Sequence, residues 1–312
     1  MTTKIIQVSD IHLGGGREPR YGVDLHQRLL SCVAHINAFH PDAALCVFTG
    51  DLTDAGEPAA YADLRAALDT LTVPYRLVPG NHDLRANLAA AFPEHPLDDN
   101  GFVQSTFDVA GARLLFLDSL AEGRVGGELC EKRLGWLDAR LGEAAGQPAY
   151  LFLHHPPVAL GLPQLDPLGL EEAGRFLALL GRHGNAGYIF FGHVHRDIAG
   201  TVAGIPFSAQ RGLHARFVLD LVNSNEIVEQ APPTYSIILI GDPGHVVVHG
   251  CDFLEHWPVY SGETGERLAS EVAPGRLRQS ESYSGYCPRD EDHQTIPAGR
   301  SSFRSVCVGC DL

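Results

Sequence analysis

Five short polar stretches of the chain combine carboxylate, carboxamide and imidazole side chains, the groups that bind divalent cations in proteins. They occupy residues 10–12, 50–54, 80–83, 154–156 and 192–195. Seven of their side chains are candidate metal donors, namely Asp10, His12, Asp51, Asn81, His154, His193 and His195. A tetrahedral site uses four ligands. Seven donors therefore predict two adjacent cations that share a bridging carboxylate.

The spacing within two of these stretches is the same. Asp10 and His12 are two residues apart, and His193 and His195 repeat that spacing. In an extended segment, alternate side chains project to the same side. We therefore expect each pair to point into one pocket from an extended exit of a strand. Glycines stand just before Asn81 and His193, where they allow tight turns.

Each polar stretch follows a block of β-branched, aromatic or aliphatic residues. The blocks occupy residues 5–8, 45–48, 75–78, 150–153 and 188–191. Such runs are typical of central strands in a parallel sheet. Open α/β sheets bind their ligands beyond the carboxyl ends of the strands. We therefore expect the polar side chains to converge on one edge of one sheet.

The remaining patterns predict the elements around these strands. Apolar residues recur at helical spacing in 25–39, 57–71, 84–92, 127–141 and 170–180. Strand patterns at 102–109 and 112–117 indicate a hairpin, and five more follow at 198–202, 205–209, 216–222, 235–240 and 245–249. Helices alternate with strands early and strands follow one another late, which predicts two sheets with helices outside, a layered α/β sandwich.

Composition limits the classes of function. The chain has 312 residues, 45% of them hydrophobic, so it can bury a large core. Its net charge of −15 argues against a broad surface for nucleic acid or for an anionic membrane. We expect no signal peptide and no membrane span, because neither a charged start with an apolar block nor an apolar run of about 20 residues is present.

Seven scattered cysteines are typical of a reducing compartment, and we expect a cytoplasmic protein. Cys307 and Cys310 form a lone CxxC pair near the C-terminus, without a second pair. We expect this pair to lie in a disordered or tail-pinning segment rather than to bind zinc. Residues 251–312 are polar and rich in Gly, Ser, Pro and Arg, and we expect them to form an extension that wraps the domain or contacts a partner subunit.

The charge balance of the predicted site points to its substrate. Two divalent cations carry +4 and the carboxylates of Asp10 and Asp51 return −2, so the centre stays positive and attracts an anion such as phosphate. Paired cations about 3.5–4 Å apart clamp the attacking and leaving oxygens and lower the pKa of a bridging water toward neutrality. The mixed nitrogen and oxygen donors suit Mn, Fe, Zn or Co better than Ca or Mg.

The motifs Asp-x-His, Gly-Asp-x-x-Asp, Gly-Asn-His-Asp, His-His-Pro and Gly-His-x-His, in this order, resemble those of the calcineurin-like metallophosphoesterase superfamily. The resemblance covers roughly residues 4–222. Within the superfamily the chain is most similar to bacterial class III cyclic-nucleotide phosphodiesterases and related glycerophosphodiesterases, whose loop at 162–167 and block at 127–141 it resembles. The resemblance implies a four-layer αββα sandwich of two mixed sheets flanked by helices, with residues 1–250 as the catalytic domain.

The same resemblance implies a division of the donors between two metals. One metal takes Asp10, His12, Asp51 and His195. The other takes Asp51, Asn81, His154 and His193, so that Asp51 bridges the two. In the family the first histidine of the His154–His155 pair is the ligand, and we expect His155 either to support a neighbouring ligand or to pack against the site.

The resemblance also assigns residues to the substrate and to support. His82 is expected to contact the phosphoryl group and to protonate the leaving alkoxide, for which an imidazole is suited. His214 resembles a substrate-side histidine, although residues 209–213 depart from the usual pattern. Asp83 or Asp54 could orient neighbouring imidazoles.

These observations predict a hydrolase that cleaves one P–O bond of a small phosphodiester with a metal-activated hydroxide. Its substrates would be 3',5'-cyclic nucleotides, glycerophosphodiesters or both, and not a nucleic-acid polymer. A phosphomonoesterase or nucleotidase and an inactive scaffold of the same fold are the alternatives. A protein phosphatase is disfavoured because Ala55 stands where those enzymes carry Arg. By family analogy we also expect a homo-oligomer formed through 251–312.

Overall fold

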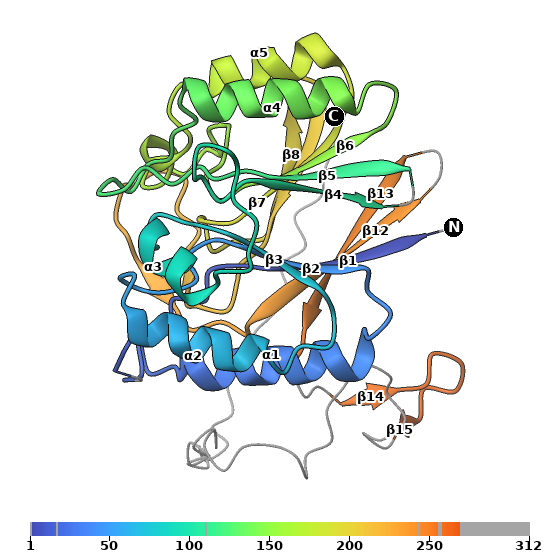
Figure 1. Cartoon of the computed structure of the whole chain (residues 1–312). Helices are drawn as coiled ribbons and strands as arrows, with labels where there is room; N and C mark the ends of the chain where they lie inside the picture. Colours follow the sequence, from blue (N-terminus) through green and yellow to red (C-terminus); the bar gives the residue numbers. More distant parts are fainter. Residues whose placement is uncertain (1, 17, 110, 242–243, 255–257, 269–312) are drawn as a thin grey trace, which may run out of the picture. The chain divides into compact units, whose positions relative to one another are not determined.

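Two β-sheets lie face to face between two layers of helices (Figure 1). The computed structural model describes residues 2–268 except 17, 110, 242–243 and 255–257. The chain divides into two units, Met1–Leu277 and Arg278–Leu312, and all described residues belong to the first. The predicted mixed α/β sandwich is confirmed. The domain boundary at residue 250, the extension 251–312 and the Cys307/Cys310 pair stay predictions, since most of that segment lies outside the described residues.

The first sheet is built around the N-terminal strand. Its strands in spatial order are β13 (His245–Asp252), β12 (Thr234–Gly241), β1 (Thr3–Val8), β2 (Leu45–Thr49) and β3 (Tyr75–Val78). The neighbours β1, β2 and β3 are parallel, whereas β12 and β13 add on in antiparallel fashion. The carboxyl ends of β1, β2 and β3 therefore meet at one edge.

The second sheet has six strands. In spatial order they are β4 (Ser105–Val109), β5 (Ala112–Phe116), β6 (Ala149–Phe152), β7 (Ala186–Phe191), β9 (Ile205–Ala209) and β8 (Ile198–Val202). The central four are parallel, and β4 and β8 pair antiparallel at the two edges. The predicted strand 102–109 begins only at Ser105, because the backbone N–H groups of Phe102 and Val103 donate to the side chains of Asp98 and Asp118.

Helices cover the outer faces of both sheets (Figure 1). Against the first sheet pack α1 (Leu25–Phe39), α2 (Pro58–Leu68) and α3 (Arg85–Ala91), and against the second α4 (Glu131–Glu143) and α5 (Ala173–His183). Successive side chains of a strand point to opposite faces of the sheet, so each strand contributes to the packing on both faces. In β1, for example, Ile5 packs between the sheets and Ile6 packs against the helices. Among the described residues, no helix is long and apolar enough to cross a membrane.

The helix predicted at 127–141 starts four residues late, at Glu131. Gly127 instead pairs with Leu170 in an isolated bridge between two loops. A Cβ atom at Gly127 would lie 2.3 Å from the ring of His155, so only glycine lets the chain pass here. This close approach, which sequence periodicity does not reveal, turns the segment 126–130 into part of the wall behind the polar residues.

One predicted strand is shorter than expected. Of the strand at 216–222 only β10 (Arg216–Phe217) forms, paired with β11 (Val228–Glu229). Leu221 and Val222 follow it with exposed fractions of 62% and 83%, because no second layer covers them in the described part of the chain. A further hairpin joins β14 (Val259–Tyr260) and β15 (Arg267–Leu268).

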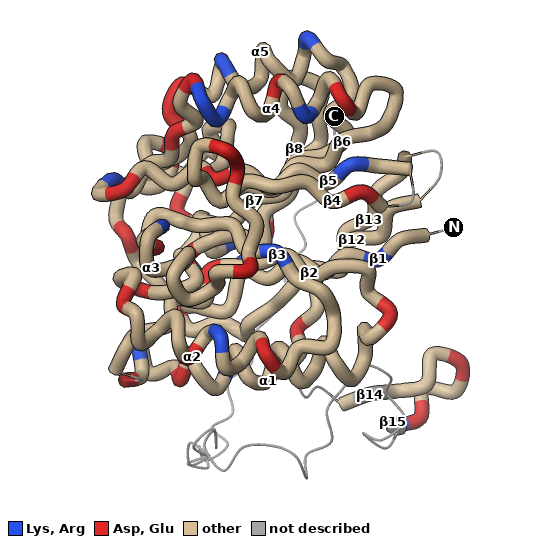
Figure 2. Tube along the Cα trace, in the orientation of Figure 1, with Lys and Arg blue, Asp and Glu red and all other residues tan. Residues whose placement is uncertain are grey.

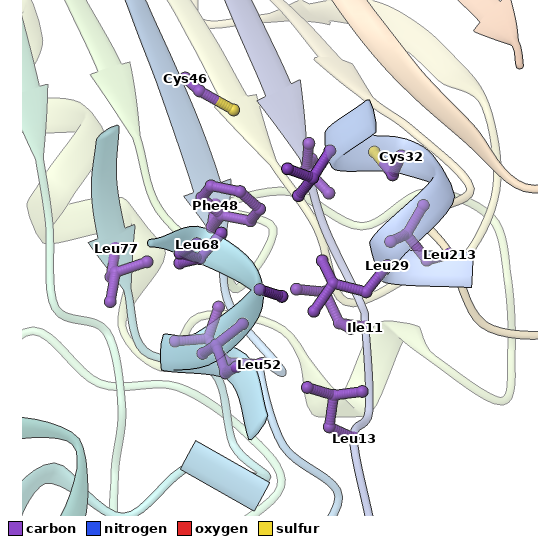
Figure 3. Close-up of a cluster of buried hydrophobic side chains, with 14 of the residues drawn as sticks. Ile11, Leu13, Leu29, Cys32, Cys46, Phe48, Leu52, Leu68, Leu77 and Leu213 are labelled. Atoms are coloured by element: carbon purple, nitrogen blue, oxygen red, sulfur yellow. The ribbon is translucent and has the colours of Figure 1, made fainter. Parts of the chain in front are cut away.

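Apolar residues that alternate with the polar donors anchor the loops after β1 and β2. Figure 3 shows Ile11 and Leu52 in the same cluster as Leu29 of α1 and Phe48 of β2. All four side chains have no exposed surface. Burial of such a side chain contributes about 1.5–3 kcal/mol. Anchoring the apolar members of each loop in this core directs their polar neighbours to the other side.

Candidate metal centre

All seven predicted donors lie just beyond the carboxyl ends of strands, but these strands belong to two sheets. The first sheet contributes Asp10, His12, Asp51 and Asn81, which follow β1, β2 and β3. The second contributes His154, His193 and His195, which follow β6 and β7. The expectation of one edge of one sheet was wrong. Strands buried on both faces look alike in sequence, so nothing in the blocks told the two sheets apart.

The backbone turns sharply at five of these donors. Asp10, His12, Asp51, His193 and His195 all have positive φ, between 45° and 71°. The predicted extended exit from β1 was therefore wrong. The cause is tertiary, because the N–H groups of Ile11 and His12 both donate to the Asp51 carbonyl at 2.9 Å. Left-handed backbone at non-glycine residues costs of order 1–3 kcal/mol each and is typical of functional sites.

Gly80 and Gly192 are needed because other chain segments pass very close to their Cα atoms, not because their backbone is left-handed. A Cβ atom at Gly80 would lie 2.2 Å from Oδ1 and 2.3 Å from the backbone N of Asp51. At Gly192 it would lie 2.1 Å from Oγ of Ser9 and 3.0 Å from Oδ2 of Asp10. Because those atoms are fixed in the core of the site, any side chain at either glycine would push a donor out of place.

The carboxylate of Asp51 lies at the centre of the cluster. Its Oδ2 atom is 3.4 Å from Nε2 of His12 and 3.2 Å from Nε2 of His154, while Oδ1 accepts a hydrogen bond from the N–H of His82 at 3.0 Å. Burial opposes ionisation, but His154 and His12 hold the pKa of Asp51 well below its usual value. The same contact outweighs burial at His154 and raises its pKa to about 9.

On one side of Asp51, two imidazole nitrogens face each other. Nε2 of His12 lies 3.1 Å from Nε2 of His195, and the latter lies 3.4 Å from Oδ1 of Asp10. The Nδ1–H of His195 donates to the carbonyl of Ala215 at 2.8 Å, which leaves Nε2 as the lone-pair nitrogen. Burial lowers the pKa of His12 well below its usual value. Two imidazole nitrogens that face each other beside carboxylates repel one another, and a cation bound between them would accept their lone pairs.

On the other side, an amide oxygen meets two imidazoles. Oδ1 of Asn81 lies 3.2 Å from Nε2 of His154 and 3.0 Å from Nδ1 of His193. The Nδ1–H of His154 donates to the carbonyl of Thr49 at 2.8 Å, so its Nε2 faces the site. Burial, followed by His154, lowers the pKa of His193 to about 3. This side therefore offers one amide oxygen and two imidazoles beside the shared Asp51.

The donor set fits two divalent cations. Asp10, His12, Asp51 and His195 offer ligand atoms that all lie within 4.8 Å of one another, and all four are buried. Oδ2 of Asp10 and Nε2 of His193 are buried without a hydrogen-bond partner. Buried polar atoms are rarely left unpaired. Cations held on either side of Asp51 would compensate the negative charge and the lone pairs that the fold concentrates here.

His82 stands at the open side of the cluster. Its side chain is 35% exposed, and its ring lies 4.6 Å from that of His12. The Nδ1–H donates to the carbonyl of Asp54 at 2.7 Å, which fixes Nε2 as the outer nitrogen. The Asp54 carboxylate also lies 3.4 Å from Nδ1 of His12 and pairs with Arg20. Asp54 thus orients the imidazole of His82 through its backbone carbonyl and lies beside that of His12. Of Asp54 and Asp83, the two residues that the sequence offered for orienting an imidazole, Asp54 is the one that contacts imidazoles.

Asp83 has a different role from Asp54. Its carboxylate accepts hydrogen bonds from the backbone of Leu52, Thr53 and Gly80 and from the hydroxyl of Tyr61. Burial, followed by Asp51, raises its pKa to about 6. Asp83 therefore joins the loops after β2 and β3 and sets the position of Asp51 relative to Asn81 through their backbones.

His155 packs behind the cluster with both ring nitrogens engaged. Nδ1 lies 2.8 Å from Oγ of Ser119, and Nε2 lies 3.1 Å from the carbonyl of Val125. Its ring centroid lies 4.9 Å from that of His154 and 5.0 Å from that of His193. An imidazole with both nitrogens bonded has no lone pair left for a cation. Ser119 was missed in the sequence, since a single serine in a loop carries no signal.

His214 lies beside the first group of donors. Its ring centroid is 4.5 Å from that of His12 and 5.2 Å from that of His195, and it is 6% exposed. Arg28 of α1 donates to the carbonyls of Leu213 and His214 at 2.7 and 3.2 Å. Sequence reasoning missed Arg28, because its contacts are to backbone atoms that any residue supplies.

Comparison with known proteins agrees with this geometry. Residues 3–197 match the family described as Calcineurin-like phosphoesterase. A probable cyclic nucleotide phosphodiesterase of Rhodopseudomonas palustris is 38% identical over 83% of this chain and 95% of its own length. A cAMP/cGMP dual specificity phosphodiesterase of Mycobacterium tuberculosis is 30% identical over 90% of this chain and 86% of its own. A probable glycerophosphodiester phosphodiesterase of Arcobacter nitrofigilis is 36% identical over 62% of this chain and 71% of its own length.

Among solved structures, a dimetal phosphatase from Danio rerio superposes with a TM-score of 0.58 at 16% identity, covering 79% of this chain and 98% of that one. At this identity the likeness concerns the fold alone. The family match, in contrast, spans the loops after β1, β2, β3, β6 and β7 that carry all seven donors. The chain belongs to the calcineurin-like phosphoesterase family.

Proposed function

We propose that the protein is a binuclear metal-dependent phosphodiesterase that hydrolyses small phosphodiesters. The observation that carries the proposal is the position of Asp51, whose Oδ2 atom lies within 3.4 Å of imidazoles on both sides. A carboxylate so placed suits a bridge between two cations. The relatives are named as cyclic nucleotide and glycerophosphodiester phosphodiesterases, which supports phosphoric diester hydrolysis here.

The donors divide on either side of Asp51. We assign the first cation position to Asp10, His12, Asp51 and His195, and the second to Asp51, Asn81, His154 and His193. Cations bound here would polarise the phosphoryl group and lower the pKa of a water molecule toward neutrality. Mn, Fe, Zn and Co all suit these nitrogen and oxygen donors.

The protein's own side chains bind and orient the substrate. His82 is exposed enough to reach a bound phosphoryl group, and the carbonyl of Asp54 holds its ring in one tautomer. When protonated at Nε2, His82 can give that proton to the leaving alkoxide oxygen as the P–O bond breaks. Arg20 and Asp54 pair beside it, so the rim there is close to neutral. The substrate-side assignment of His214 stays a prediction.

The wider surface supports a small substrate. The chain carries 38 acidic and 23 basic residues. Figure 2 shows Lys and Arg dispersed among Asp and Glu along the described chain, and near α4 and α5 they alternate. A polynucleotide is held by Lys and Arg gathered along its backbone. Cyclic nucleotides and glycerophosphodiesters, each with one phosphate charge, remain the proposed substrates, in a cytoplasmic and oligomeric enzyme.

The test is a comparison of rates and bound metal in one preparation. Cyclic AMP, glycerophosphoethanolamine and a phosphomonoester are supplied with Mn²⁺, and bound metal is counted by elemental analysis. We expect two cations per chain and faster turnover of at least one diester than of the monoester. A protein that binds metal but prefers the monoester would be a phosphomonoesterase, and a metal-free, inert protein would be a scaffold. Either result rejects the proposal.

A further inference from the structure

A glutamine side chain crosses the space between the two sheets. Gln7 lies in β1 two residues after Ile5, so its side chain points to the same inner face of the sheet. It is 1% exposed, and its neighbour Val47 on β2 belongs to the apolar core between the sheets. Burial of an amide costs free energy unless its N–H groups find partners. A glutamine in this place therefore requires an explanation.

The side-chain amide of Gln7 bonds to both sheets. Its Nε2 atom donates to Oγ1 of Thr49 in β2 at 3.1 Å and to the carbonyl of Phe191 in β7 at 3.2 Å. From the second sheet, Nε2 of Gln210 donates in return to the backbone carbonyl of Gln7 at 3.2 Å. One residue thus joins β1 and β2 to β7 and to the end of β9.

The three strands that the Gln7 amide connects all lead into donor loops. Each of β1, β2 and β7 ends two residues before the first metal donor of its loop, and these donors are Asp10, Asp51 and His193. Two of the residues that form the connection, Thr49 and Phe191, are the last residues of their strands. The amide therefore holds strands of both sheets at the points where the donor loops begin.

Two further hydrogen bonds cross between the sheets at this end. The Nδ1–H of His154 donates to the carbonyl of Thr49 at 2.8 Å, and the N–H of His193 donates to Oδ1 of Asp10 at 3.0 Å. Both involve predicted metal donors, whereas Gln7 is not a donor. Apolar packing between the sheets is non-directional. Hydrogen bonds of fixed geometry restrict the sliding of one sheet past the other more strongly.

We propose that Gln7 is a positioning residue for the binuclear centre, because it fixes the register of the two sheets and with it the separation of the two cation positions. The inference rests on the proposed function for the presence of two cations. Paired cations act together on one phosphoryl group when they lie about 3.5–4 Å apart. A shift of the sheets by a fraction of that distance alters the bridge at Asp51, although every donor is still present.

The alternative is that Gln7 contributes to stability alone. Ile5→Val is the matched control, because Ile5 lies on the same face of the same strand, is fully buried and offers no hydrogen bond. Gln7→Met keeps the length of the side chain and removes its N–H groups. A role in stability alone predicts that both variants unfold at lower urea concentration and that neither changes the bound metal pair.

The experiment uses the full chain with Mn²⁺ as the probe. The exchange coupling of two Mn²⁺ ions, measured by electron paramagnetic resonance, depends on their separation and on the ligand that bridges them. We expect Gln7→Met to bind two ions with a changed coupling. With bis(p-nitrophenyl) phosphate, kcat should fall about 10–100-fold and KM should change little. Ile5→Val should keep the wild-type coupling and kcat. Wild-type coupling and kcat in Gln7→Met would overturn the inference.

Thr49→Val decides the case in which Gln7→Met does not fold. It removes one acceptor of the Gln7 amide and leaves in place the bond to Phe191 and the backbone carbonyl of Thr49. We expect a smaller change of the coupling, and an unchanged coupling would overturn the inference in that case. Wild-type protein that binds no pair of cations and cleaves no diester would reject the proposed function. A binuclear, active enzyme whose coupling does not respond to these variants rejects only the role of Gln7.

Discussion

Oδ2 of Asp51 lies 3.2 Å from Nε2 of His154, although the two residues follow strands of different sheets. The distance between the two cation positions therefore depends on how the sheets pack. Large side chains on the inner faces, including Phe116, Phe152 and Phe190, fill the space between them. Because close-packed interiors deform little, this core holds the two halves of the site in register.

Asp51→Asn should remove the shared negative charge from both cation positions. An amide oxygen binds a divalent cation far more weakly than a carboxylate does, so we expect bound metal to fall at both positions. Diester turnover should fall at least about a hundredfold. Elemental analysis and rates with excess Mn²⁺ check this, with Asp99→Asn, an exposed acid, as the control. Retention of two cations in Asp51→Asn would show that this carboxylate is not the bridge.

Gly80→Ala should damage the site through its backbone. The new Cβ would lie 2.3 Å from the backbone N of Asp51, which cannot move without the loop. We expect weaker metal binding and a free energy of unfolding lower by about 1–3 kcal/mol, as for other overpacked positions.

Gly135→Ala is the matched control for Gly80→Ala. Gly135 lies exposed within α4, and a Cβ there meets no atom within 4 Å. Alanine has the higher helix propensity, so this variant should be more stable by about 0.5–1 kcal/mol, with unchanged metal binding. Urea unfolding and metal titration of both variants check the pair. Equal effects would mean that close approach at Gly80 does not matter.

His82→Ala should keep both cations and slow the chemical step. If His82 protonates the leaving oxygen, rates with an alkoxide leaving group should fall about 10²–10⁴-fold. Because p-nitrophenolate leaves without a proton, bis(p-nitrophenyl) phosphate should be affected much less. Steady-state rates with cyclic AMP and with the aryl diester check this. Equal losses on both substrates would assign His82 to binding rather than to proton transfer.

Ser119→Ala should destabilise the wall behind the second cation position. It leaves Nδ1 of His155 without its partner at 2.8 Å in a fully buried place. An unsatisfied buried polar group costs about 1–3 kcal/mol, and we expect a loss of unfolding free energy of that size. Ser224→Ala, at an exposed loop position, is the control and should change nothing. Urea unfolding compares the two, and an unchanged Ser119→Ala would mean that this hydrogen bond contributes no stability.

The seven donors could be predicted because each one directly follows a buried strand. The apolar block predicts the strand, and the residue type after it predicts the metal donor. Because the carboxyl ends of parallel strands meet at one edge of a sheet, the donors are then expected to lie close together. The positive φ angles of Asp10 and His12 could not be predicted, since they depend on hydrogen bonds to Asp51, which lies about forty residues further along the chain. For the same reason the sequence did not show which of the two sheets each strand joins.

The supporting residues were the least predictable part of the site. Ser119 acts through one hydroxyl, Arg28 through backbone carbonyls, and Ala215 through its own carbonyl. These contacts leave no recognisable pattern in the sequence, because the partners are backbone atoms or a single side chain that is distant in sequence. Asp54 and Asp83 were both candidates from sequence, and only the geometry separated the one that touches imidazoles from the one that joins loops.

His95→Gln should make the protein less sensitive to acid. Nε2 of His95 accepts a hydrogen bond from the N–H of Leu77 at 2.8 Å, and this requires the neutral ring. Burial, followed by Arg76, lowers the pKa of His95 to about 4, below the 6.5 of an unfolded chain. The unfolded state therefore binds the proton first, so the stability that His95 contributes is present above pH 6.5 and is lost as the pH falls toward 4.

Glutamine offers an oxygen to Leu77 and does not titrate. Between pH 7 and pH 5 the wild type should lose about 1–2 kcal/mol more unfolding free energy than His95→Gln. Urea unfolding at both pH values, with chelator present so that metal binding does not contribute, measures the difference. The other histidines are shared by both proteins and cancel in the comparison. If both proteins lost the same free energy, His95 would already be protonated or solvated in the folded state, and its hydrogen bond to Leu77 would not contribute to acid sensitivity.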